Sequence, residues 1–247
     1  MPDDEALEQM YGKDYLQFLS TEESHSGNDG ITRVRKQLQK MSSGIFLDYA
    51  CGGGALLREV SNLGWEVVGI ERDAETARKF SELLEIRIIS DVEKLAGTFP
   101  ADVIHFGDVL EHLTDIDNEF PRFLRLVKND GLVIAQGPLE ANFNVFYLGI
   151  KLVRYLRGKP PSDMPPYHVA LATAKGQRAL FNRMRLTEIE FTIFETAHPA
   201  PQTLRVKDIR KPRAVGLFLL RKISQAVTNF FPRKMGNRYF YMGTVSK

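Results

Sequence analysis

The residues best placed to do chemistry are Asp48 and the three glycines of the run Asp48-Tyr49-Ala50-Cys51-Gly52-Gly53-Gly54. Apolar or aromatic residues fill four of positions 45–49, as in a short buried strand, and helix-forming residues begin at Ala55. Glycines let the backbone approach a nucleotide-like ligand at the carboxyl end of a strand. The Asp48 carboxylate would repel a pyrophosphate and bind an ammonium group. The stretch therefore favours a cofactor with a cationic, amino-acid-like end.

Two common phosphate-binding motifs do not fit the sequence. The dinucleotide fingerprint G-x-G-x-x-G would need glycine at position 57, where Leu57 stands. The loop G-x-x-x-x-G-K-[ST] also fails, because the two Gly-Lys pairs of the chain are followed by Asp14 and Pro160. The glycine turn is thus of another kind.

The run 48–54 resembles motif I of the class I S-adenosylmethionine-dependent methyltransferases, usually D-x-G-x-G-x-G. Ala50 replaces the first glycine, and we expect an ordinary backbone angle at this position. The resemblance implies S-adenosyl-L-methionine as the cofactor and S-adenosyl-L-homocysteine as its product. It assigns cofactor contacts to Asp48, Ala50, Cys51, Gly52 and Gly54.

Acids also follow the second and third apolar runs. Glu71 lies about 20 residues beyond the glycine turn, where an acid can accept hydrogen bonds from both ribose hydroxyls. The resemblance assigns this role to Glu71, with Arg72 beside it, and places Asp91 and Val92 at the adenine. The alternatives are a surface ion pair between Glu71 and Arg72, and an ordinary helix N-cap at Asp91.

The stretch Asp108-Val-Leu-Glu-His-Leu113 resembles the family sequence E-V-L-E-H-(L/V), and it is the most specific match in the chain. The resemblance places Asp108 and Val109 at the methionine part of the cofactor or at the substrate. His112 is a candidate catalytic base, with a structural role as the alternative.

Further candidate residues lie in two segments outside the stretches described so far. Pro166-Tyr167-His168 resembles the P-x-H sequence that follows a variable substrate lid in the family. His168 is therefore the better candidate for a base that deprotonates a hydroxyl, beside the alternative of a structural histidine, and Tyr167 is a substrate candidate. Tyr11 and Tyr15 are candidates for a lid, or they pack a helix onto the domain. No metal is expected, because a sulfonium is already an activated methyl donor.

Apolar runs alternate with helix-forming stretches, which predicts a parallel sheet covered by helices on both faces. The expected strands are 45–49, 65–70, 86–90, 102–107, 132–136, 187–194 and 238–245. The expected helices are 31–41, 55–60, 74–84, 118–127, 144–157, 173–184 and 214–231, with a loop at 24–30 and a turn at 128–131. The predicted fold class is α/β: a Rossmann-like seven-stranded sheet, mostly parallel with an antiparallel last strand, with helical lid insertions.

One methyltransferase domain is expected over residues 1–247. Its expected parts are an N-terminal helical lid (1–44), a cofactor-binding core (45–137), a lid insertion (138–172), the completion of the core (173–195 and 238–247) and a basic helical insertion (196–237).

The composition of the chain limits the class of protein to which it can belong. The 247 residues are 43% hydrophobic and 26% charged, as in soluble globular proteins. A single cysteine excludes an internal disulfide and a cysteine zinc cluster. The acidic start and the absence of any uncharged apolar run of roughly 18 residues lead us to expect a cytoplasmic protein. Residues 201–247 carry eleven Lys or Arg and one acid, so they suit an anionic partner or form a solvated basic face.

The predicted function is methyl transfer to a hydroxyl of a small or lipophilic acceptor. Segments 143–157 and 205–234 combine apolar and basic residues, and they could contact a membrane peripherally, cap a lipophilic substrate or close a dimer. A nucleic-acid partner is not expected, since the chain has no N-P-P-Y tetrapeptide and no cysteine after the fourth strand. The alternatives are an RNA methyltransferase that uses the basic C-terminal region, and a non-catalytic binding subunit of the same fold.

Overall fold

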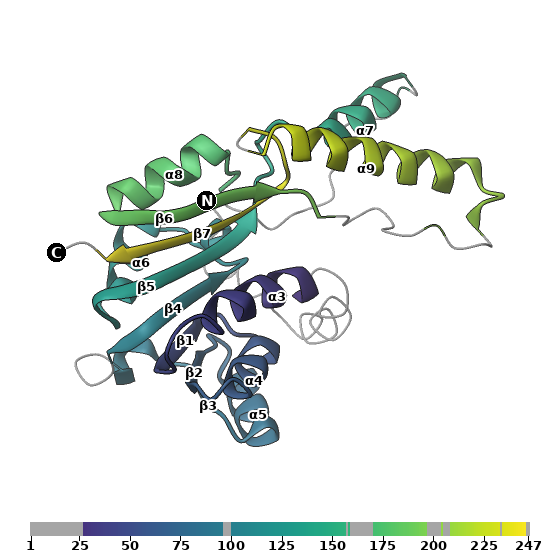
Figure 1. The fold of residues 1–247 in the computed structure, drawn as a ribbon. Coiled ribbons are helices and arrows are strands. Elements are labelled where there is room, and N and C mark those ends of the chain that lie inside the picture. The colour runs from purple at the N-terminus through teal and green to yellow at the C-terminus, as the bar shows by residue number, and fades with distance from the viewer. Residues whose placement is uncertain are drawn as a thin grey trace.

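The computed structural model describes residues 27–95, 100–156, 158, 170–196, 204, 208–232 and 234–245 (Figure 1). In this part of the chain, seven strands form one sheet in the order β3-β2-β1-β4-β5-β7-β6. The strands are β1 (Ile45–Tyr49), β2 (Glu66–Ile70), β3 (Arg87–Ile89), β4 (Ala101–Gly107), β5 (Val127–Pro138), β6 (Leu186–Phe194) and β7 (Arg238–Val245). Only β7 runs antiparallel to its neighbours, β5 and β6, so the predicted fold class is confirmed.

Helices cover both faces of this sheet. They are α3 (Gly27–Leu38), α4 (Ala55–Ser61), α5 (Ala74–Leu84), α6 (Ile116–Leu124), α7 (Val145–Leu156), α8 (Ala174–Arg183) and α9 (Pro212–Phe230), with short 3₁₀ helices η1 (Val92–Leu95) and η2 (Leu110–His112). Figure 1 shows α3, α4 and α5 on one face and α6 and α8 on the other.

Alternate residues of each strand supply the two halves of the core, as the pleat of a strand requires. Phe46 of β1 and Val103 of β4 pack with Val34 of α3 and Leu57 of α4. Their neighbours in sequence, such as Leu47 and Ile104, pack on the opposite side with Phe120 of α6 and Phe181 of α8. The central strands are therefore apolar on both faces, which explains why they read as continuous apolar runs.

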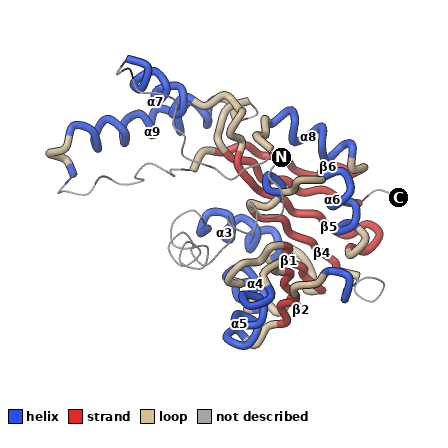
Figure 2. The backbone as a smooth tube through the Cα atoms, turned by 180° about the vertical axis from the view of Figure 1, so that it is seen from behind, coloured by secondary structure: helices blue, strands red, loops and turns tan. Residues whose placement is uncertain are grey.

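Helices α7 and α9 form a pair that extends away from the sheet, as both views of the molecule show (Figures 1 and 2). The helices approach closely at Gly149 of α7, where an added Cβ atom would lie 2.7 Å from the Leu220 side chain of α9. Within the described residues, no helix is both long enough and apolar enough to cross a membrane.

The expected loop at 24–30 and the expected turn at 128–131 are wrong, and the helix expected at 118–127 is α6 at Ile116–Leu124. Helix α3 begins at Gly27, inside the expected loop at 24–30. Strand β5 already begins at Val127, so the expected turn at 128–131 lies within the strand. The polar residues are accommodated by a register irregularity opposite β4 and by a left-handed backbone angle at Asp130, with φ of 64°. Glycine and polar residues at a bulge thus mimic a turn in the sequence.

Candidate active site

The glycine turn joins β1 to α4 through three residues with left-handed backbone angles. Their φ values are 57° at Ala50, 51° at Gly52 and 71° at Gly54. The expectation of an ordinary angle at Ala50 is therefore wrong. An L-residue with a Cβ atom in this region is disfavoured by about 1–2 kcal/mol, because the Cβ approaches the following carbonyl oxygen. Glycine would be free of this strain, so the replacement in motif I has a conformational cost.

Asp48 is held by a histidine on the neighbouring strand. Asp48 and His105 face each other in the register of β1 and β4, and Oδ1 of Asp48 lies 2.7 Å from Nδ1 of His105. Both side chains are buried. Oδ2 of Asp48 accepts no hydrogen bond from the described residues, so one carboxylate oxygen is available at the start of the turn.

Glu71 closes the turn from the end of β2. Its Oε2 atom accepts a hydrogen bond from the backbone N–H of Gly52 at 3.0 Å, and its Oε1 atom accepts one from the N–H of Asp73 at 3.2 Å. Burial raises the pKa of Glu71 above its ordinary value of 4.5, against the opposing effect of these two hydrogen bonds. The side chain thus fixes the glycine turn and keeps lone pairs for a ligand.

A cavity of about 100 Å³ opens at the carboxyl ends of β1, β2 and β3. Six residues line it: Tyr49, Ala50, Ile70, Arg72, Ser90 and Val92. Three of them, Ala50, Arg72 and Val92, are residues that the sequence assigns to cofactor binding. Burial of the Tyr49 hydroxyl raises its pKa to about 12, so the ring enters the cavity as a neutral phenol. Ligands of open α/β sheets bind at this edge, where the strand order reverses between β1 and β4.

Asp91 lies beside this cavity and caps η1. Its Oδ1 atom accepts a hydrogen bond from the backbone N–H of Glu93 at 3.0 Å, which is the N-cap interaction that the sequence left open. The side chain is exposed, so the second carboxylate oxygen faces solvent. The N-cap role is thus compatible with the predicted contact to the adenine, which stays a prediction.

Asp108, at the end of β4, binds an arginine that the sequence did not indicate. Its two carboxylate oxygens lie 2.6 and 2.7 Å from Nη2 of Arg238, the first residue of β7. The neighbouring Val109 packs its side chain in the core, so only its backbone can contact a ligand. His112 is half-buried, and its backbone N–H donates to the carbonyl of Val109. The predicted lid and substrate residues Tyr11, Tyr15 and Tyr167 and the predicted base His168 lie outside the described residues.

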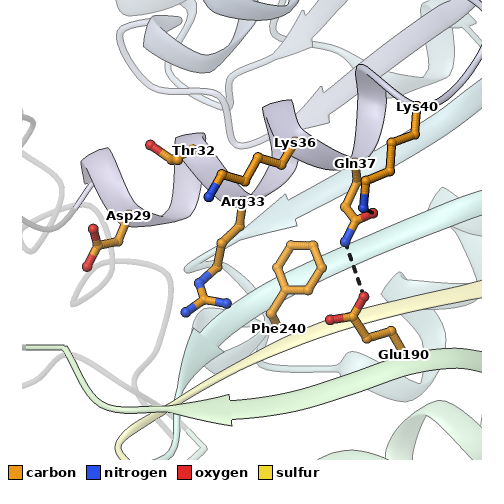
Figure 3. Close-up of a pocket in the computed structure, with 8 residues that line it drawn as sticks. All are labelled: Asp29, Thr32, Arg33, Lys36, Gln37, Lys40, Glu190 and Phe240. Carbon is orange, nitrogen blue, oxygen red and sulfur yellow. Dashed lines mark hydrogen bonds between the residues drawn. The ribbon is translucent and has the colours of Figure 1, made fainter. Parts of the chain in front are cut away.

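A larger cavity, of about 350 Å³, lies between α3 and the strands β6 and β7 (Figure 3). Cationic side chains of α3, among them Arg33 and Lys36, form one wall, and Phe240 lies at its floor. Nε2 of Gln37 donates to Oε2 of Glu190 across it at 3.2 Å. No residue that the sequence assigns to cofactor or substrate lines this cavity. It is separate from the turn at Asp48.

Comparison with known proteins identifies the family. Residues 18–198, well over half of the chain, match the model of a family described as a methyltransferase domain. The chain belongs to this family. Its fold is that of the class I S-adenosylmethionine-dependent methyltransferases.

The relatives of the methyltransferase include enzymes of quinone biosynthesis. A ubiquinone biosynthesis O-methyltransferase of Rhodopseudomonas palustris strain BisB18 is 28% identical over 131 residues, which are 50% of this chain and 51% of that protein. The chain thus spans about half the length of this relative. The enzyme of the same name from Rickettsia conorii is 23% identical over 175 residues, which are 66% of this chain and 60% of that protein.

A solved structure shows the same fold. The S-adenosylmethionine-dependent methyltransferase of Archaeoglobus fulgidus has a TM-score of 0.57 and 16% identity to this chain. The superposition covers 92% of this chain and 99% of that one.

The side chains of the methyltransferase fit the cofactor that the family implies. Asp48 offers a carboxylate oxygen that accepts no hydrogen bond from the described residues, Glu71 offers buried acceptors for hydroxyls, and the cavity at Tyr49 has an aromatic wall for a planar base. Among the described residues, no three His, Cys, Asp or Glu side chains gather so that they could hold a metal ion.

The sequence did not indicate several residues of this site. His105 and Arg238 reach their partners only through the strand order, which brings β4 beside β1 and β7 beside β5. Tyr49, Ile70 and Ser90 stand at or just after strand ends, and this position was the available signal. Residues at the carboxyl ends of parallel strands share one edge of the sheet and tend to contact the same ligand.

Proposed function

We propose that this methyltransferase transfers the methyl group of S-adenosyl-L-methionine to a hydroxyl of a small lipophilic acceptor. The observation that carries the proposal is the similarity to two ubiquinone biosynthesis O-methyltransferases, whose names indicate O-methylation in the synthesis of a lipophilic quinone. The exposed apolar surface of α7 and α9 also supports an amphipathic acceptor.

In this proposal, the described residues hold the cofactor. Asp48 receives the ammonium group on its free oxygen, Glu71 accepts hydrogen bonds from the ribose hydroxyls, and the cavity beside Tyr49 receives the adenine. When bound, the cofactor supplies a methyl group that is already activated by the positive sulfur. The protein then contributes alignment and the exclusion of water.

The acceptor hydroxyl becomes a better nucleophile when a base removes its proton. His168 is the proposed base, and His112 at the end of η2 is the second candidate. The acceptor lies on the β4–β5 side of the turn, opposite the adenine cavity, because β4 carries Asp108 and η2 at the same edge of the sheet. We further propose that segments 143–157 and 205–234 contact a membrane peripherally, so that a lipophilic acceptor need not cross water.

Calorimetric titration with S-adenosyl-L-homocysteine tests the cofactor site. We expect wild-type binding, and affinity lower by about tenfold or more in Asp48→Asn and in Glu71→Gln, because each variant loses a charge-assisted hydrogen bond. Glu75→Gln, an exposed acid of α5, is the matched control and should bind as the wild type does. A folded wild type that does not bind would refute the proposal.

Methyl transfer from labelled donor then tests the acceptor. We expect label on catechols with alkyl chains, and more transfer as the chain becomes longer. His168→Ala should lower kcat without changing the affinity for S-adenosyl-L-homocysteine. Label that appears only on RNA would replace this proposal with the RNA alternative.

A further inference from the structure

Helix α9 is amphipathic, but it buries its polar face and exposes its apolar face. Its most buried side chains are polar: Arg221 and Ser224 are 0% exposed and Thr228 is 3% exposed. Its outward face carries large apolar side chains, with Leu219 at 53%, Ile223 at 56% and Phe230 at 82% exposure. A helix that packs on a water-soluble core shows the opposite arrangement.

A buried carboxylate explains the polar inner face. Glu195 follows directly after β6, and it accepts hydrogen bonds from the Arg221 guanidinium at 2.5 Å, the Ser224 hydroxyl at 2.6 Å and the Thr228 hydroxyl at 3.0 Å. The Arg221 guanidinium also lies 3.5 Å from the centre of the Phe146 ring of α7. These contacts fix the rotation of α9 about its own axis, because a rotated helix would leave Glu195 buried and unpaired.

The outward face is consequently held in place as an apolar row. Leu219, Ile223 and Phe230 share one side of the helix with Ala226, at spacings of three and four residues, and all four are exposed. We refer to these four residues as the outer stripe. On the adjacent helix α7, Leu148, Leu152 and Tyr155 form a second exposed row with helical spacing.

The charges around these rows have one sign. Neither α7 nor α9 contains an Asp or Glu. Arg213 and Lys222 are exposed on α9, and Lys151 is exposed on α7. A partner of this surface must therefore combine an apolar interior with an anionic boundary. The helix pair projects from the sheet (Figure 2).

We propose that the outer stripe docks on the interface of an anionic phospholipid bilayer. This inference rests on the proposed function, since a lipophilic acceptor would be available at that surface. Apolar side chains enter the acyl boundary, and lysines and arginines remain among anionic headgroups, which is how an interfacial helix binds. A second copy of the chain fits less well, because a two-fold contact would bring identical cationic rims together.

Sedimentation with vesicles tests the inference, without cofactor or acceptor. Wild-type protein should bind vesicles of phosphatidylcholine mixed with phosphatidylglycerol, bind pure phosphatidylcholine more weakly, and release as salt screens the charges. Combining Leu219→Ser, Ile223→Ser and Phe230→Ser should weaken binding by about tenfold or more. Combining Arg213→Gln and Lys222→Gln should weaken binding to the mixed vesicles by about fivefold per cation.

Control variants carry changes of the same kind elsewhere on the surface. Leu83→Ser combined with Ile189→Ser removes exposed apolar side chains from α5 and β6, and Lys175→Gln combined with Lys79→Gln removes exposed cations from α8 and α5. Both should bind vesicles as the wild type does. Equal vesicle binding by the outer-stripe variant and the wild type would overturn the inference. A wild-type dimer that this variant converts to a monomer would overturn it too.

The two proposals fail in different measurements. The outer-stripe variant should retain wild-type affinity for S-adenosyl-L-homocysteine, since α9 packs on α7 and β6 and lies away from the β1–α4 turn in both views (Figures 1 and 2). A wild type that binds S-adenosyl-L-homocysteine but no vesicle refutes the docking surface alone. A wild type that binds mixed vesicles but not S-adenosyl-L-homocysteine refutes the proposed function and leaves the lipid contact supported.

Discussion

Asp108 and Arg238, 130 positions apart, are joined at the active edge of the sheet, with Nη2 of the arginine 2.6 and 2.7 Å from the two carboxylate oxygens. Arg238 lies mostly buried, while the Asp108 side chain is half exposed. Burial alone would lower the pKa of Arg238, but the charges of Asp108 and Glu111 outweigh it and raise that pKa. The guanidinium therefore stays charged and ties β7 to the loop after β4.

Removal of the guanidinium should destabilise this edge. We expect Arg238→Met to lower the free energy of unfolding by about 1–3 kcal/mol, because two nearby carboxylates lose their cation. Arg238→Lys should cost less, since it keeps the charge. Arg178→Met, which breaks the more exposed pair with Glu188, should cost about 1 kcal/mol or less. Urea unfolding measures all three, and similar losses for Arg238→Met and Arg178→Met would contradict a special role for Arg238.

The raised pKa of Glu71 predicts that cofactor affinity depends on pH. Ribose hydroxyls donate to the ionised carboxylate, so binding lowers the Glu71 pKa and releases protons. Affinity for S-adenosyl-L-homocysteine should therefore fall as pH drops through the raised pKa of the free protein, which lies above 4.5. Calorimetry in buffers of different ionisation enthalpy detects the released protons. Glu71→Gln should flatten this dependence, and Glu75→Gln should retain it; a flat wild-type profile would argue against the ribose role.

Glu71 also affects the free energy of unfolding, and this effect changes with pH in the opposite direction to its effect on cofactor affinity. Because its folded pKa is raised, the ionised carboxylate costs stability above that pKa, and protonation removes the cost as pH falls. Near neutral pH, Glu71→Gln should thus unfold at the same or higher denaturant concentration than the wild type, although it binds the cofactor more weakly. A Glu71→Gln variant that is at least as stable as the wild type but binds the cofactor more weakly would indicate a binding role for Glu71 and not a purely structural one.

Ala50→Gly should stabilise the free protein. The left-handed angle at Ala50 costs about 1–2 kcal/mol, and glycine removes this strain at an entropic cost of roughly 0.5–1 kcal/mol. We therefore expect a net gain of about 0.5–1 kcal/mol, seen as a higher urea midpoint. Ala179→Gly, at an exposed site inside α8, is the control and should lose about 0.5–1 kcal/mol. A loss in both variants would contradict the strain.

The sequence predicted most elements of the sheet because its central strands are buried on both faces. β1 and β7 match the expected boundaries, and β2, β3, β4 and β6 differ by one residue at one or both ends. Apolar runs of this kind end where the backbone must turn, so composition locates them. Strand β5 differs because Lys128–Asp130, near its start, are polar and exposed, and only the pairing of the flanking residues Val127 and Leu132 with β4 extends the strand over them.

The residues of the candidate site were also predictable only in part, because contacts between distant parts of the sequence position some of them. Asp48 begins the glycine-rich run and Glu71 directly follows β2, so local sequence indicates their role. His105 and Arg238 act through partners 57 and 130 positions away, which no local pattern indicates. For α9, the apolar and basic composition of the segment predicted a helix but not which face of it is buried. Glu195, outside the helix, decides that question through Arg221, Ser224 and Thr228.

Cys51 offers a direct probe of the glycine turn, since it is the only cysteine of the chain. Burial raises the pKa of its thiol strongly, and the charges of Asp48 and Glu71 add to this effect. Since the thiolate is the reactive form, native protein at pH 8 should be alkylated at least about a hundredfold more slowly than urea-unfolded protein. Because burial is the largest cause, Glu71→Gln should quicken native labelling far less than unfolding does. Fast labelling of the native wild type would show that the turn opens readily or is packed less tightly than the Cys51 environment indicates.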